Sequence, residues 1–92
     1  MTDIVFKWDT TYHCWKKEGI KCLHNIFNVY IHKYPENQYL VSIGQEGYIN
    51  VHHTIFDSMV AVQFFIKSKY NGIVKFRDPN EEEHIERIKT VS

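Results

Sequence analysis

The sequence predicts an α+β fold in which an antiparallel sheet carries one core helix on one of its faces. Between residues 22 and 56, apolar side chains recur at every second position, which is the period of a strand. Over residues 58–70 they recur at the three- and four-residue spacing of a helix. Hydrophobic residues make up 43% of the 92 residues, which is typical of a globular chain. No linker or repeat interrupts the sequence, so we expect a single compact domain over residues 1–92.

The N-terminal segment is expected to begin with a short strand, because Ile4, Phe6 and Trp8 alternate with their neighbours. A short helix is expected over residues 9–19. A polar residue stands at its start and Gly19 at its end. The threonines and the tyrosine in this stretch suit a strand equally well.

Three antiparallel strands are expected between residues 22 and 56. Residues 34–38 have turn chemistry, and residues 45–47 form a short hairpin loop with a glycine. The apolar residues fall on odd-numbered positions, so we expect one continuous apolar face. Its members are Leu23, Phe27, Val29, Ile31, Tyr39, Val41, Ile43, Ile49, Val51 and Ile55.

The core helix is expected over residues 58–70, with Asp57 as its N-cap and residues 71–72 as its stop. It is expected to pack on the odd-numbered face of the sheet. Residues 73–76 then predict another short strand. A C-terminal acidic helix is expected over residues 79–90, because a proline at its first position and acidic residues in its first turn favour a helix start.

Net charge and composition narrow the class of protein. Eleven basic side chains balance 11 acidic ones, which excludes a uniformly basic binder of nucleic acid or anionic membrane. Residues 1–77 nevertheless carry nine basic and six acidic side chains, whereas residues 78–92 carry two and five. No apolar run is long enough to span a membrane, and no signal peptide is recognisable. We therefore expect a cytoplasmic protein, in the host cell if the chain is viral.

Two groups of residues are candidate chemical sites. His13, Cys14, Cys22 and His24 supply nitrogen and sulfur ligands for zinc, but their spacing matches no zinc motif. In residues 52–57, two adjacent histidines precede an aspartate. Adjacent residues of a strand face opposite ways, so only one histidine at a time can share a site with a given partner; His53 is expected on the core side and His52 outside. We predict no cofactor, no metal and no enzymatic activity.

The even-numbered face of the sheet is predicted as a contact surface, because its side chains are aromatic and polar rather than charged. The sequence leaves open whether another helix covers this face. Between residues 57 and 78 every charged side chain is basic, which predicts a basic patch. The predicted binding residues are Lys67, Lys69, Lys75, Arg77, Tyr30, Tyr34, Tyr48 and His52.

The chain resembles the small inhibitors that phages make against host defence, including anti-CRISPR proteins. The resemblance lies in size, an AT-biased composition and the lack of catalytic motifs, and it carries over no residue. It implies a phage or mobile-element protein that binds and blocks a host protein or nucleoprotein complex such as a CRISPR effector. The alternative is a single-stranded nucleic-acid-binding module that uses the aromatic sheet face. A third hypothesis is a small metal-dependent or acid–base enzyme.

Overall fold

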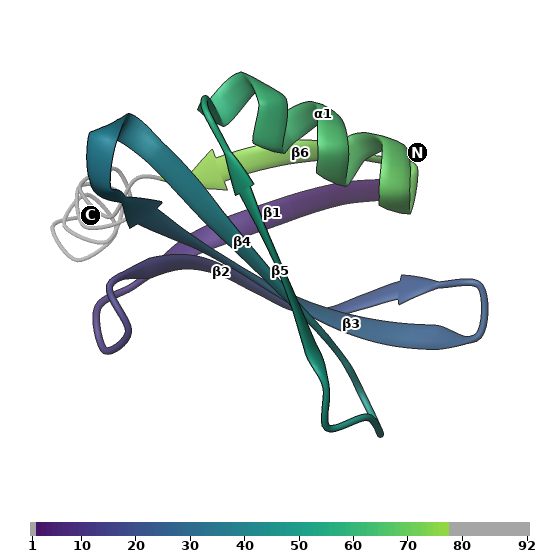
Figure 1. Ribbon diagram of the computed structural model, residues 1–92. Coiled ribbons are helices and arrows are strands. Elements are labelled where there is room, and N and C mark those ends of the chain that lie inside the picture. Colours follow the sequence, from purple (N-terminus) through teal and green to yellow (C-terminus); the bar gives the residue numbers. More distant parts are fainter. Residues whose placement is uncertain (1, 78–92) are drawn as a thin grey trace, which may run out of the picture.

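The computed structural model describes residues 2–77, which form six strands, one α-helix and a short 3-10 helix (Figure 1). The predicted C-terminal acidic helix lies outside the described residues. Within them, no helix is long and apolar enough to cross a membrane. The elements are β1 (Thr2–Asp9), β2 (Cys14–Cys22), β3 (Asn25–Tyr34), η1 (Pro35–Asn37), β4 (Gln38–Gln45), β5 (Val51–Phe56), α1 (Met59–Tyr70) and β6 (Gly72–Arg77).

The strands form one sheet in the order β5-β4-β3-β2-β1-β6. β1 to β5 pair antiparallel with their sequence neighbours, whereas β6 pairs parallel with β1. The predicted α+β class is confirmed, but the sheet is mixed rather than antiparallel. The reason is the connection, because α1 carries the chain over one face from the β5 edge to the far side of β1 (Figure 1). A crossover of this length allows a parallel partner.

The prediction of a helix over residues 9–19 is wrong, because most of this segment belongs to strand β2. The Asp9 carboxylate accepts hydrogen bonds from the backbone N–H groups of Thr11 and Tyr12, at 2.8 and 3.0 Å, and so closes a turn rather than starting a helix. The chain then reverses, and Trp15 meets Trp8 edge to face with their ring centroids 5.4 Å apart. A cross-strand aromatic pair of this kind stabilises a hairpin, which outweighs the weak local helix signal.

The core lies between α1 and the face of the sheet that was predicted to be apolar. Val29 and Ile31 of β3 and Val41 of β4 are at most 1% exposed. They pack with Val62 and Ile66 of α1, both of which are fully buried. The odd-numbered face is therefore confirmed for β3 and β4, and the helix covers that face as expected.

The alternation changes parity in β5, so the predicted faces of this strand are wrong. Gly44 pairs with Val51 and Ile43 with His52, which places even-numbered residues of β5 on the helix side. Val51 and Ile55 lie on the opposite face, 48% and 50% exposed. Leu23 and Ile49, two other members of the predicted apolar face, lie in connections and are 93% and 98% exposed. The loop before β5 is longer than a tight hairpin, and its length sets this parity.

The N-cap of α1 is Ser58 rather than the predicted Asp57. The Ser58 hydroxyl accepts a hydrogen bond from the backbone N–H of Ala61 at 3.2 Å, which identifies it as the N-cap. Asn71 ends the helix in the left-handed conformation with φ of 51°. A serine with extended backbone angles satisfies one N–H of the first turn, and this is the function that was predicted for Asp57.

Replacement of this cap is expected to weaken the fold modestly. We expect Ser58→Ala to lower the free energy of unfolding by about 1 kcal/mol, because the N–H of Ala61 loses its acceptor. Ser68 is exposed on the same helix, so Ser68→Ala is the matched control and is expected to change stability by less than about 0.5 kcal/mol. Urea unfolding measures both variants, and equal stabilities would contradict the assignment of the cap.

Candidate functional site

The face of the sheet opposite α1 carries no other element among the residues that the structure describes (Figure 1). We call it the open face. Register partners on this face form one line that crosses all six strands, roughly 24 Å long at the usual strand spacing. This line, the cross-sheet row, consists of Arg77, Lys7, Lys16, Tyr30, Ser42 and His53.

The first half of the cross-sheet row is basic. Lys7 stands opposite Arg77 on one side and opposite Lys16 on the other. Like charges in directly opposed positions of a sheet destabilise it. Lys16 is compensated by Asp9 at 2.9 Å and Glu18 at 3.4 Å, whereas Lys7 and Arg77 have no acidic partner within residues 2–77. The row therefore presents two cations whose repulsion the described fold does not relieve.

The ion pair with Asp9 sets the charge state of Lys16. The hydrogen bond to Asp9 raises the pKa of the Lys16 ammonium well above its usual value, and the second bond to Glu18 adds to this effect. The hydrogen bond from Lys16 lowers the pKa of the Asp9 carboxyl in turn. Both groups keep their charges over the physiological pH range, so Lys16 stays a cation beside Lys7.

A depression of about 370 Å³ lies beside the middle of the cross-sheet row. It is lined by Tyr12, Lys16, Glu18, Tyr30 and His32. Burial raises the pKa of the Tyr30 hydroxyl, and the nearby Glu18 carboxylate raises it further, so the phenol stays neutral. The Tyr12 ring is 65% exposed at the rim. An aromatic hollow that holds both an ammonium group and a carboxylate suits a planar, polar group of a partner.

The second half of the cross-sheet row ends in a hydrogen-bonded pair. The Ser42 hydroxyl and Nδ1 of His53 are 2.8 Å apart, and Ser42 is only 7% exposed. A catalytic serine needs a base that a third group orients. No carboxylate hydrogen-bonds to His53 within residues 2–77. We therefore describe the pair as a cross-strand hydrogen bond. It also shows that His53, expected on the core side, lies on the open face.

The four candidate zinc ligands do not converge. Cys14 pairs with Asp9 on the open face and is fully buried there, and this burial raises the pKa of its thiol. Cys22 lies on the helix side, where its sulfur is 3.8 Å from the carbonyl oxygen of Lys69. The two thiols thus belong to opposite faces of the sheet. No group of three potential metal ligands occurs in the described part of the chain.

The structure divides the predicted binding residues between two faces. Tyr30, Tyr34, Lys75 and Arg77 lie on the open face, although Lys75 is bound to Asp3 at 2.9 Å. The other four lie elsewhere. Lys67 and Lys69 project from α1, whereas Tyr48 and His52 line a depression of about 260 Å³ beside Phe27 and Ile43 on the helix side. His52 was predicted to lie on the outer face. This prediction is wrong, because His52 pairs with Ile43 on the helix side.

Sequence reasoning did not predict Lys7, Lys16, Tyr12 or His53 as binding residues of this face. A signal for Lys7 was present, because the alternation of β1 places it opposite the buried Phe6. Lys16 and Tyr12 were not placed on this face because a helix was predicted over residues 9–19. His53 was not placed there because odd-numbered residues of β5 were predicted on the core side.

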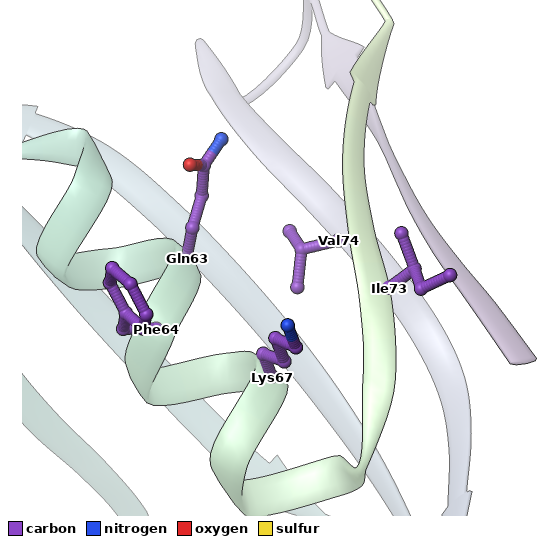
Figure 2. A pocket seen from close by; sticks show the side chains of 5 residues that line it. All are labelled: Gln63, Phe64, Lys67, Ile73 and Val74. Atoms are coloured by element: carbon purple, nitrogen blue, oxygen red, sulfur yellow. The ribbon is translucent and has the colours of Figure 1, made fainter. Parts of the chain in front are cut away.

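A second hollow, of about 240 Å³, lies between α1 and β6 (Figure 2). Gln63, Phe64 and Lys67 reach it from the helix, and Val74 points toward it from the strand. Its lining is mostly apolar, and Lys67 is the one charged residue among the described residues that line it. Lys67 therefore lines a hollow beside β6, whereas Lys75 and Arg77, which were expected to share one basic patch with it, lie on the open face.

Comparisons with protein-family models, with curated proteins and with solved structures found no match.

Proposed function

We propose that this chain is a non-enzymatic binding protein that uses its open face to block a host nucleoprotein complex. The observation that carries the proposal is the adjacency of Arg77, Lys7 and Lys16 in the cross-sheet row. Aligned cations oppose folding, and two of them have no acidic partner within residues 2–77. A partner surface that carries negative charge relieves this repulsion on binding. The free energy that the repulsion costs in the free protein is then regained in the complex and increases the affinity.

The middle of the open face supports the same proposal. Arginine and tyrosine are enriched among the residues that dominate binding energy at protein interfaces. Here Arg77 and Tyr30 belong to one row, and the half-exposed Val51 and Ile55 add apolar area at its far end. The face therefore offers cations, aromatic rings and aliphatic groups in sequence. The resemblance to phage inhibitors supports a partner in the cytoplasm of a bacterial host, such as a CRISPR effector.

Charge reversal tests the proposal. We expect the double variant Lys7→Glu, Arg77→Glu to bind a purified CRISPR effector complex at least about tenfold more weakly than the original chain, because like charges then face each other across the contact. Binding is measured by biolayer interferometry, together with inhibition of target cleavage by the effector.

Lys33→Glu is the control for this experiment. Lys33 is also exposed on a strand, but its register partner Tyr39 belongs to the helix side of the sheet. We expect this variant to bind as the original chain does. Equal losses in both variants would indicate a general charge effect and contradict a contact through the open face, and an original chain that binds no effector would reject this partner class.

A second candidate function is direct binding of single-stranded nucleic acid. The hollow lined by Tyr12, Lys16, Glu18, Tyr30 and His32 favours it, because bases stack on aromatic rings. Fluorescence anisotropy with a labelled oligothymidylate separates the two candidates. Binding that weakens steeply with salt favours the nucleic-acid module, whereas salt-tolerant binding to the effector alone favours the inhibitor.

A further inference from the structure

The two edges of the sheet differ in how they are protected against pairing with another strand. Edge strands present unpaired N–H and C=O groups, and proteins usually blunt them with lysines, prolines or bulges. The β6 edge carries Lys75 and Arg77 and has Lys67 beside it. The β5 edge, whose sequence is VHHTIF, contains no lysine, arginine, aspartate, glutamate or proline. Its register with β4 runs without a shift from end to end.

Exposed apolar side chains accompany the β5 edge. Val51 and Ile55 are 48% and 50% exposed on the open face, and Ile49, just before the strand, is 98% exposed. Half-exposed aliphatic residues on an edge strand without a bulge are a signature of pairing. Within residues 2–77 β5 pairs only with β4, so alternate residues of β5 aim both backbone groups away from the sheet.

We propose that β5 pairs antiparallel with β5 of a second copy of this chain, across a two-fold axis that passes beside His53. In this register Val51 faces Ile55 of the second copy, and Ile55 faces its Val51. Two apolar, β-branched pairs then cover the exposed aliphatic side chains of the edge. A second copy suits this edge because the strand contains no lysine, arginine or carboxylate that would face its own image across an isologous interface.

The charges at the other edge argue against the same pairing there. Two copies of β6 would bring Lys75 and Arg77 of each copy into one interface, where like charges repel. Pairing through β5 alone closes after two copies and gives a dimer rather than a filament.

This dimer would join the two open faces. His53 ends the cross-sheet row, so pairing it with His53 of the second copy continues the row into the second sheet. The Arg77 ends would then lie at opposite ends of a twelve-stranded sheet. The inference concerns the free protein and does not depend on the proposed partner.

Sedimentation velocity of the full chain tests the dimer over a roughly hundredfold range of protein concentration. We expect a species of twice the 11.1 kDa chain mass. Ile55→Lys is expected to raise the dimer dissociation constant at least about tenfold, because each dimer then contains two lysines in place of apolar contacts.

Ile73→Lys is the matched control. Ile73 is an isoleucine of similar exposure, 43%, on the open face of the other edge strand. We expect it to leave the dissociation constant unchanged. A monomer at every concentration, a dimer that Ile55→Lys leaves intact, or one that only Ile73→Lys disrupts would each overturn the proposal.

A cross-link supplies a test that does not depend on how Ile55→Lys folds. Directly opposed residues of antiparallel strands have Cα atoms about 4.5–5.5 Å apart, within the range of a disulfide. His53→Cys is therefore expected to form a symmetric intermolecular disulfide under mild oxidation, located by peptide mass spectrometry so that the native cysteines are distinguished. Ile73→Cys is expected to form none. Absence of the cross-link in the folded His53→Cys variant would contradict the register.

Discussion

Phe6→Ala is expected to lower the free energy of unfolding by about 3–5 kcal/mol. Phe6 is fully buried in β1, where its ring stacks on Phe76 with centroids 5.3 Å apart and joins the core beneath α1. Its truncation removes buried apolar area and leaves a cavity beside Phe76 on the helix side of the sheet. Since a domain of this size is stabilised by only about 5–15 kcal/mol, the loss is a large part of the total.

Urea unfolding, followed by the fluorescence of Trp8 and Trp15, measures this effect. Phe64→Ala is the matched control, because Phe64 is 65% exposed on α1. We expect it to change the free energy of unfolding by no more than about 0.5 kcal/mol. If Phe6→Ala and Phe64→Ala lower the free energy of unfolding equally, the assignment of the core to the helix side of β1 is wrong.

Gly72→Ala is expected to destabilise the protein by about 1–3 kcal/mol through overpacking. Gly72 begins β6 and is paired with Thr2 of β1. A Cβ atom at this position would lie 2.6 Å from Cδ1 of Ile4 and 2.8 Å from the backbone oxygen of Thr2. The side chain of Ile4 is buried and the Thr2 oxygen belongs to the paired strand, so neither can move without disturbing the parallel pair.

Gly44→Ala provides the comparison for this substitution. Gly44 also lies in a strand, but the nearest atom to its added Cβ is Cγ2 of Val51 at 3.9 Å, an ordinary contact. We expect this variant to be as stable as the original chain or slightly more stable, since alanine restricts the unfolded chain. Thermal unfolding of both variants measures the difference. An alanine tolerated equally well at both positions would contradict the close approach of β6 to β1.

The local period of the sequence predicted the class of most elements and the buried face of the central strands. Val29 and Ile31 alternate in sequence and are buried together, and the spacing of Val62 and Ile66 predicts the helix that covers them. The local period did not predict the hairpin of β1 and β2. There the contact between Trp8 and Trp15 determines the structure, and a local pattern contains no information about which tryptophan meets which.

The candidate site was predictable only in part, for a related reason. The alternation of β3 placed Tyr30 outside the core, but the neighbours of Tyr30 in the sheet come from β2 and β4. Lys67 and Arg77 belong to one basic stretch of sequence, yet Lys67 reaches the hollow beside β6 from α1 and Arg77 lies at the end of the cross-sheet row. Charge in sequence therefore identified a basic region without identifying a surface.

The sequence by itself determined an α+β chain with a strand-rich middle, one core helix and basic residues ahead of an acidic end. These properties follow from composition and from periods of two and 3.6 residues, which each segment carries alone. Only the tertiary structure decided that β6 lies parallel to β1, that β5 reverses its faces, and that Arg77, Lys7, Lys16 and Tyr30 stand in one line. The physical reason is that strand order and register depend on contacts between residues far apart in the chain, and loop length shifts every side chain of a strand together.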